Sequence, residues 1–139
     1  MRASRLTAII FYVTHVARSA AFYRDSLGAA PLFDYGDTDS FLALRLGDVE
    51  IHLHARQQVD PRLASTWPPE AAFHGAGIAL QIHASDLARR RQLIERAGGQ
   101  VLQEASRQPW GAIEMLVADP DGYCILLWEG QKDLDIQTW

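Results

Sequence analysis

The sequence is poor in cysteine, since Cys124 is the only one among its 139 residues. A single thiol cannot form a disulfide within the chain, and it cannot supply the several thiolates of a cysteine-based zinc site. Disulfide-stapled scaffolds and cysteine zinc proteins are therefore excluded. Because structural disulfides are typical of oxidising compartments, this composition favours a cytoplasmic location.

An excess of basic residues is also missing. The chain carries 13 Lys and Arg against 17 Asp and Glu, which gives a formal net charge of −4. Nucleic-acid binding relies on clustered cations that contact phosphates, so we expect no nucleic-acid partner. The basic run from Arg89 to Arg91 is interpreted as a solvated helix face.

Long hydrophobic runs are absent as well. The apolar segment from Leu6 to Val13 is far shorter than the roughly 20 residues of a membrane-spanning helix. No small-residue cleavage pattern of a signal peptide accompanies it, so we expect no membrane association. What the sequence does contain is 48% hydrophobic residues, enough for the core of one domain or of two small, tightly joined halves.

Hydrophobic patterning in the first half predicts a strand, a helix and a β-hairpin. Residues 8–13 are apolar on both alternating faces, which is typical of a strand buried on both sides. Ala20, Tyr23 and Leu27 recur at helical spacing, and Gly28 provides a C-terminal stop. The dipeptide Gly47-Asp48 separates two further strands, predicted at residues 41–46 and 49–54.

The second half repeats this order at an offset of about 70 residues. Ser85 or Asp86 can cap a helix that runs to Ala97, and Gly98-Gly99 ends it. Strands are predicted at residues 78–82, 101–104, 112–117 and 124–128, with turns at Pro109-Trp-Gly111 and Asp119-Pro-Asp-Gly122.

The repeat predicts the fold class. We expect an α+β fold in which two tandem βαβββ units form a cupped, partly open mixed sheet within a single domain, residues 1–139. Repeat 1 covers about residues 6–55, a linker about 56–75, and repeat 2 about 76–130. Trp67 in this long linker is either a lid over the cleft or a simple anchor.

Three motifs then carry a resemblance to a known family. They are Ser19-Ala-Ala-Phe-Tyr-Arg-Asp-Ser-Leu-Gly28 after a strand, Gln108-Pro-Trp-Gly111 followed by Glu114, and Asp119-Pro-Asp-Gly122 before the final strand. In this order and spacing the chain resembles the vicinal oxygen chelate superfamily, also called the glyoxalase/bleomycin-resistance/dioxygenase superfamily. Gln-Pro-Trp-Gly followed by a Glu is most similar to its bleomycin-resistance binding proteins. That resemblance implies a homodimer whose clefts sequester a drug without chemistry on it.

Enzymes of this superfamily usually hold a divalent metal through inward-facing strand residues. The resemblance places those positions at Ala8, His52, Gly77 and Leu126. Ala, Gly and Leu offer no side-chain donor, whereas a catalytic metal needs three or four nitrogen or oxygen ligands. We therefore expect no metal, no other cofactor and no catalytic residue of the family type.

The strand at residues 49–54 places three polar side chains on one face. Glu50, His52 and His54 alternate with apolar residues that should pack on the helix. Three interpretations stay open: a partly solvated polar face, contacts to a ligand, or a non-standard metal site. His15, His74 and His83 fall in loops or at strand ends and are taken as surface residues.

The same alternation predicts the rest of the cup lining. Ile10, Gln81 and Cys124 belong to it, and Trp110 lies on the rim, either as a stacking platform or as a plug that packs its turn. Trp128 is either a ligand contact or part of a subunit interface. The predicted ligand-binding set is Tyr12, Phe41, Arg45, His52, His54, Trp110, Glu114 and Trp128.

Two functions follow. The first is a metal-independent small-molecule binding protein that sequesters an aromatic or cationic, antibiotic-like ligand, as in antibiotic resistance. The alternative is an atypical metal-dependent lyase, isomerase or dioxygenase that uses Glu50, His52, His54 and Glu114. A homodimer is expected in both cases, although Ile9 replaces the proline that the drug-binding relatives associate with strand exchange.

Overall fold

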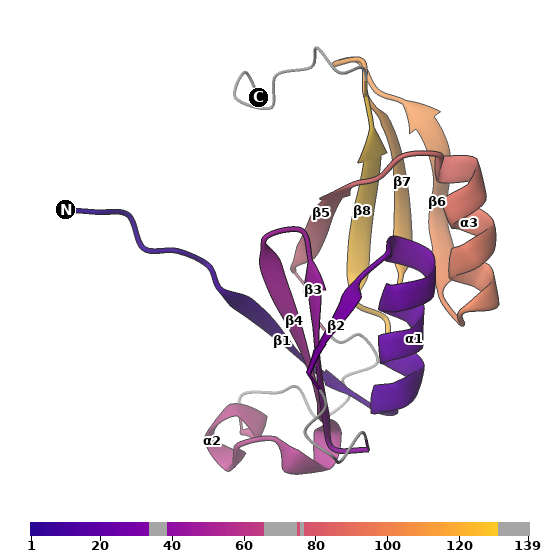
Figure 1. Cartoon of the computed structure of the whole chain (residues 1–139). Helices are drawn as coiled ribbons and strands as arrows, with labels where there is room; N and C mark the ends of the chain where they lie inside the picture. The colour runs from indigo at the N-terminus through magenta and orange to yellow at the C-terminus, as the bar shows by residue number, and fades with distance from the viewer. Residues whose placement is uncertain (34–38, 66–74, 76, 131–139) are drawn as a thin grey trace. The chain divides into compact units, whose positions relative to one another are not determined.

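The computed structural model describes residues 1–33, 39–65, 75 and 77–130 (Figure 1). The chain divides into two compact units, Met1–Ala72 and Phe73–Trp139. Each unit holds one four-stranded mixed sheet with a helix packed against it, which confirms the α+β fold of two tandem βαβββ units.

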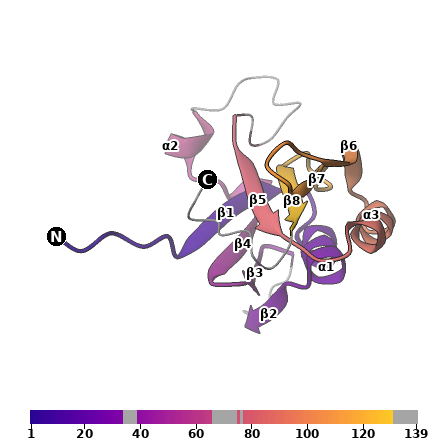
Figure 2. The same cartoon turned by 90° about the horizontal axis from the view of Figure 1, so that it is seen from above.

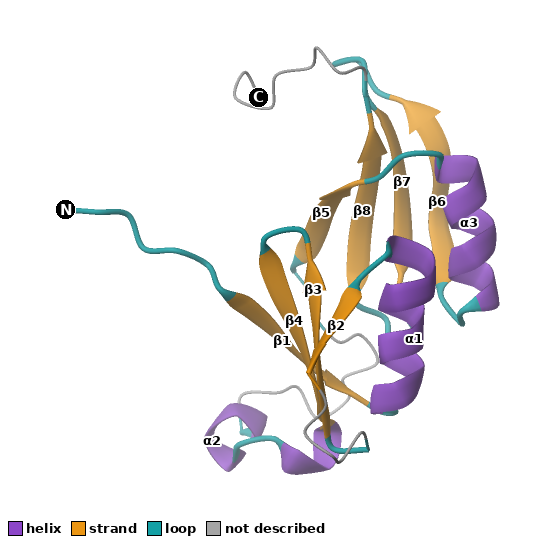
Figure 3. Ribbon diagram, viewed as in Figure 1, coloured by secondary structure: helices purple, strands orange, loops and turns teal. Residues whose placement is uncertain are grey.

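The first unit is a four-stranded sheet with one helix packed against it. The strand order is β1-β4-β3-β2, in which β1 and β4 are parallel and the other pairs are antiparallel. Figure 3 shows α1 beside this sheet. The elements are β1 (Ala8–Val13), α1 (Val16–Leu27), β2 (Ala30–Phe33), β3 (Phe41–Leu46), β4 (Val49–Ala55), η1 (Arg56–Gln58) and α2 (Pro61–Ala64).

Helix α1 is held by its aromatic face. Phe22 and Tyr23 are fully buried, and the Tyr23 ring stacks on Phe11 of β1 with centroids 5.9 Å apart. Leu53 pairs with Phe11, and Ile51 lies two residues before Leu53 on the same strand. The side chains of Phe11, Ile51 and Leu53 therefore point to the sheet face that α1 covers. Gly28 ends the helix at φ +77°, a left-handed conformation that glycine adopts without steric cost.

The second unit repeats the topology as β5-β8-β7-β6, with β5 and β8 parallel. The Asp86 side chain caps the helix by accepting from the Arg89 N–H at 3.1 Å. Glu129 of the last strand accepts from the Leu87 N–H, which ties the helix start to the sheet. The elements are β5 (Ala79–His83), α3 (Leu87–Arg96), β6 (Gln100–Arg107), β7 (Ile113–Ala118) and β8 (Cys124–Glu129).

Some boundaries differ from the sequence prediction. Strand β6 runs to Arg107 instead of ending at Glu104, and its pairing with β7 has two register irregularities. β6 is an edge strand whose side chains are mostly exposed, so apolar alternation does not mark its length. The sequence pattern predicts no strand at Ala30–Phe33, where the structure has β2. β2 lies at the edge of its sheet, a position that accepts Pro31 because one side of an edge strand is unpaired.

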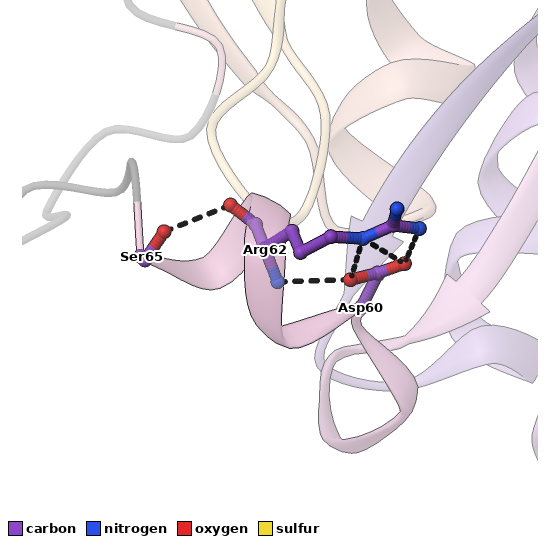
Figure 4. A network of polar contacts seen from close by, with 3 residues as sticks. All are labelled: Asp60, Arg62 and Ser65. Atoms are coloured by element: carbon purple, nitrogen blue, oxygen red, sulfur yellow. Dashed lines mark hydrogen bonds and ion pairs between the residues drawn. The ribbon is translucent and has the colours of Figure 1, made fainter.

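The chain leaves the first sheet through two short helical turns. Asp60 caps α2 by accepting from the Arg62 N–H at 2.8 Å, and it also pairs with the Arg62 guanidinium (Figure 4). The Ser65 hydroxyl closes this turn by donating to the Arg62 carbonyl oxygen. Trp67 and His74, for which the sequence suggested a lid or anchor and a surface position, lie outside the described residues.

The described helices are all short. None of them is long and apolar enough to cross a membrane. The N-terminal segment 1–7 runs outward from the start of β1 (Figure 1 and Figure 2) and is exposed throughout.

Candidate functional site

In the first unit, five predicted site residues share the sheet face opposite α1, which we call the helix-distal face. The register sets them in rows that run across three strands. One end row is Tyr12–His54–Phe41, the middle row is Ile10–His52–Ala43, and the other end row is Ala8–Glu50–Arg45. The prediction that Glu50, His52 and His54 point away from the helix is therefore confirmed in this unit, where Ile51 and Leu53 on the opposite face are buried.

The first end row is aromatic. The His54 ring lies 4.8 Å from the Phe41 ring, edge to face, and 5.7 Å from the Tyr12 ring. Partial burial among these rings lowers the pKa of His54, and the neighbouring His52 lowers it further because two cations would repel. The row therefore favours a neutral imidazole at His54 and offers a partly apolar cluster of mutually inclined aromatic rings.

The middle of the face holds a polar pair. His52 Nε2 lies 3.1 Å from Glu50 Oε1, and about a quarter of each side chain is exposed. The carboxylate orients the imidazole and leaves Nδ1 as its other polar atom. Such a pair can hydrogen-bond a ligand or transfer a proton, and the sequence predicted the shared face but not this contact.

In the second unit, the helix-distal face carries the other predicted residues. Trp128 of β8 pairs laterally with Glu114 of β7 and with His83 of β5. The His83 and Trp128 rings meet at 4.4 Å, and only 7% of Trp128 is exposed. Gln81 and Cys124 lie on the same face by register.

Trp110 reaches this face from the turn before β7. Its Nε1 donates to Glu114 Oε1 at 3.1 Å, while 48% of the residue stays exposed. Gly111 closes the turn with a φ of +99°, and its N–H donates to the Gln108 carbonyl oxygen. The half-exposed indole is thus oriented by the carboxylate of Glu114, whose register partner on β8 is Trp128.

Comparison with known proteins assigns the chain to a family. The sequence profile of the Glyoxalase/Bleomycin resistance protein/Dioxygenase superfamily matches residues 5–127. The chain belongs to this superfamily. No protein of curated function matches the sequence significantly.

Several solved structures share the fold of this chain. A glyoxalase-related enzyme from Fulvimarina pelagi is 21% identical, with a TM-score of 0.75 over 92% of this chain and 89% of its own. A glyoxalase/bleomycin resistance protein/dioxygenase family enzyme from Burkholderia phytofirmans PsJN is 14% identical, with a TM-score of 0.77 over 91% and 98%. A protein of unknown function from Agrobacterium tumefaciens str. C58 is 27% identical, with a TM-score of 0.70 over 94% and 97%.

The superfamily's usual metal does not fit the residues present. Ala8 pairs with Glu50 and Leu126 pairs with Gln81 across the strands, but alanine and leucine have no side-chain nitrogen or oxygen to bind a metal. Within the described part of the chain, no group of three or more His, Cys, Asp or Glu side chains is arranged to hold a metal ion. No mechanistic step is therefore assigned to a metal.

His83 is exposed at the end of β5, as the sequence predicts. The sequence does not predict its contact with Trp128, because β5 extends one residue further than expected and places the imidazole against that indole. The parallel pairing of β5 with the last strand was the signal, since it sets His83 opposite Trp128. The convergence of both helix-distal faces on one cup stays a prediction, because it concerns the relation between the units.

Proposed function

We propose that this protein is a metal-independent small-molecule binding protein that sequesters an aromatic or cationic, antibiotic-like ligand. The observation that carries the proposal is the Trp110–Glu114 contact. A half-exposed indole held by a carboxylate presents a π-face and a negative charge together. A cation over an aromatic face gains about 0.5–2 kcal/mol, and a flat ring gains a comparable stacking energy.

The first unit supports the same ligand chemistry. Tyr12, His54 and Phe41 form an aromatic row on its helix-distal face, and His52 with Glu50 adds hydrogen-bonding groups beside it. Mostly apolar surfaces with a few oriented polar groups are how small-molecule sites are usually built. This combination favours recognition by shape and stacking.

The donor chemistry supports binding without a metal. Ala8, Gly77 and Leu126 occupy positions where metal-dependent relatives carry ligands, and none of the three has a side-chain nitrogen or oxygen. His52 alone would have to hold the ion, and its Nε2 already faces Glu50. A single remaining imidazole nitrogen is too little for a stable site.

Equilibrium titration with 9-aminoacridine, a flat aromatic cation, tests the proposal. Trp fluorescence should be quenched on binding, and calorimetry gives the affinity independently of the indole signal. Trp110→Ala should weaken the calorimetric affinity by roughly tenfold, the equivalent of one stacking contact. Leu102→Ala, which removes another exposed apolar side chain of the second unit, is the matched control. Equal affinity of wild type and Trp110→Ala would contradict the proposal.

A second candidate is an atypical enzyme of the superfamily, and the Glu50–His52 pair favours it. A carboxylate-oriented imidazole is a competent general base. Stoichiometric Fe, Mn, Ni or Zn in protein purified without chelator, lost in His52→Ala, would favour a lyase, isomerase or dioxygenase over a binding protein. A metal-free acid–base enzyme would instead be detected by turnover in a substrate screen that His52→Ala abolishes.

A further inference from the structure

A hollow lies where the N-terminal segment joins the first sheet. It has a volume of about 440 Å³, within the range of roughly 300–1,000 Å³ typical of ligand pockets. It adjoins the charged end row of the helix-distal face, since it shares Arg45 and Glu50 with that row. Its lining residues are Arg5, Leu6, Thr7, Arg45, Asp48 and Glu50.

Most of the charged side chains that line this hollow do not form ion pairs with one another. Neither Arg5, Arg45 nor Asp48 forms an ion pair with any side chain that the structure describes. Glu50 is engaged by His52, and its backbone N–H donates to the Thr7 carbonyl oxygen, which fixes the wall of the hollow. Two residues with guanidinium groups and two residues with carboxylates thus line one open hollow.

This charge pattern selects a head group with both signs. A simple anion would meet the guanidinium groups of Arg5 and Arg45 but would be repelled by Asp48 and Glu50. A simple cation would be attracted by the two carboxylates but repelled by the two guanidinium groups. An ammonium next to a carboxylate, as in the head of an amino acid, can pair with both sets, and guanidinium groups bind carboxylates through paired hydrogen bonds.

The hollow also lies at a defined distance from the aromatic row. Arg45 and Phe41 are four residues apart on β3, which corresponds to about 13 Å along an extended strand. His52 and the exposed Ile10 form the row between them. A ligand that uses both ends must therefore carry its ring and its charged head on opposite ends of an extended spacer.

We propose that the helix-distal face of the first unit binds a zwitterionic aromatic compound, with its ring on the Tyr12–His54–Phe41 row and its amino-acid-type head between Arg5, Arg45 and Asp48. This inference rests on the proposed function, whose ligand class it narrows. It assigns the hollow a role in specificity that the aromatic residues alone cannot supply.

Four compounds with the same ring and spacer test the head group. They are Nε-(2-naphthoyl)-L-lysine, 6-(2-naphthamido)hexanoic acid, N-(5-aminopentyl)-2-naphthamide and N-pentyl-2-naphthamide, which are respectively zwitterionic, anionic, cationic and neutral. Calorimetric titration of the full-length protein gives their affinities. The zwitterion should bind roughly tenfold more tightly than the neutral compound, because two partly exposed ionic contacts each contribute a few-fold.

Charge-removing variants identify which side chains contact which half of the head. Arg45→Ala combined with Arg5→Ala should weaken the two carboxylate-bearing compounds by roughly three- to tenfold and leave the cationic compound unchanged or slightly tighter. Asp48→Asn should weaken the two ammonium-bearing compounds instead. Arg89→Ala, at an exposed position of α3, is the matched control and should change nothing. Circular dichroism of each variant confirms that it folds.

The possible outcomes distinguish failure of the zwitterion site from failure of the proposed binding function. Equal affinities for all four compounds would overturn the zwitterion site while leaving an aromatic binding protein intact. Tightest binding of the purely anionic or purely cationic compound would overturn it as well. Absence of binding by all four, together with absence of 9-aminoacridine binding, would overturn both proposals.

Discussion

Trp110 and Glu114 lie four residues apart, and the indole Nε1 of the first donates to the carboxylate of the second at 3.1 Å. The turn that ends at Gly111 brings the indole back over the start of β7. The contact fixes the direction of a half-exposed ring without burying it. It therefore combines rigidity with access, which reduces the entropy cost of ligand binding.

The Trp110–Glu114 contact has two separable effects on a bound ligand. Glu114→Gln keeps a carbonyl oxygen that can accept from the indole but removes the charge. We expect this variant to weaken binding of cationic 9-aminoacridine by roughly three- to tenfold, with little change in affinity for the neutral N-pentyl-2-naphthamide. Glu114→Ala releases the indole and should weaken both ligands, as measured by calorimetry. Equal losses for both ligands in Glu114→Gln would show that the charge has no separate role.

Burial of His54 makes stability depend on pH. Its pKa is lowered in the folded chain, chiefly by desolvation and then by His52, so the unfolded chain binds a proton more readily. The neutral imidazole's contribution to stability is complete above the unfolded pKa of about 6.5 and is lost as pH falls through the folded pKa. NMR titration of the His54 imidazole should give a midpoint below the unperturbed histidine value of about 6.5. His54→Phe should flatten the acid side of the stability profile, and an unchanged profile would contradict this assignment.

Helix α3 depends on a cap in an unusual conformation. Asp86 has a φ of +54°, and its side chain accepts from the Arg89 N–H. Asp86→Ala removes the acceptor and places alanine in the left-handed region, which should cost about 2 kcal/mol of unfolding free energy. Asp86→Asn tolerates the same φ and retains an acceptor, so its denaturation midpoint should stay close to that of the wild type. Equal midpoints for the alanine and asparagine variants would rule out this role of the cap.

A homodimer remains a proposal, and exposed apolar residues favour it. Leu6 and Ile78, which adjoin the edge strands β1 and β5, are 64% and 68% exposed. Apolar side chains next to unpaired strand edges are usually covered by another surface. Light scattering after size exclusion should give about twice the 15.5 kDa chain mass. A monomer at tens of micromolar would contradict it.

Sequence patterning predicted most of the fold because buried strands have a strong signal. The hairpin around Gly47 and the strand ending near Trp128 alternate or run apolar in the way their burial requires. The end of β6 near Arg107 could not be predicted, since an edge strand pairs on one side only and tolerates polar residues on both faces.

The candidate site was predictable in composition but not in contacts. The period of a strand places Glu50, His52 and His54 on one face without any knowledge of the fold. The His83–Trp128 contact depends on the register between strands that are distant in sequence, and a shift of one residue reverses the face of a side chain. The hollow around Arg5 depends on the path of the N-terminal segment, which no periodicity encodes.

The claim that binding needs no metal is tested most directly by the affinity for 9-aminoacridine, measured by calorimetry. The affinity is compared between protein dialysed against EDTA and protein supplied with one equivalent of Fe²⁺, Mn²⁺, Ni²⁺ or Zn²⁺. Because Ala8, Gly77 and Leu126 offer no donor, we predict the same affinity in every condition. Binding that appears only after addition of a metal would contradict the account.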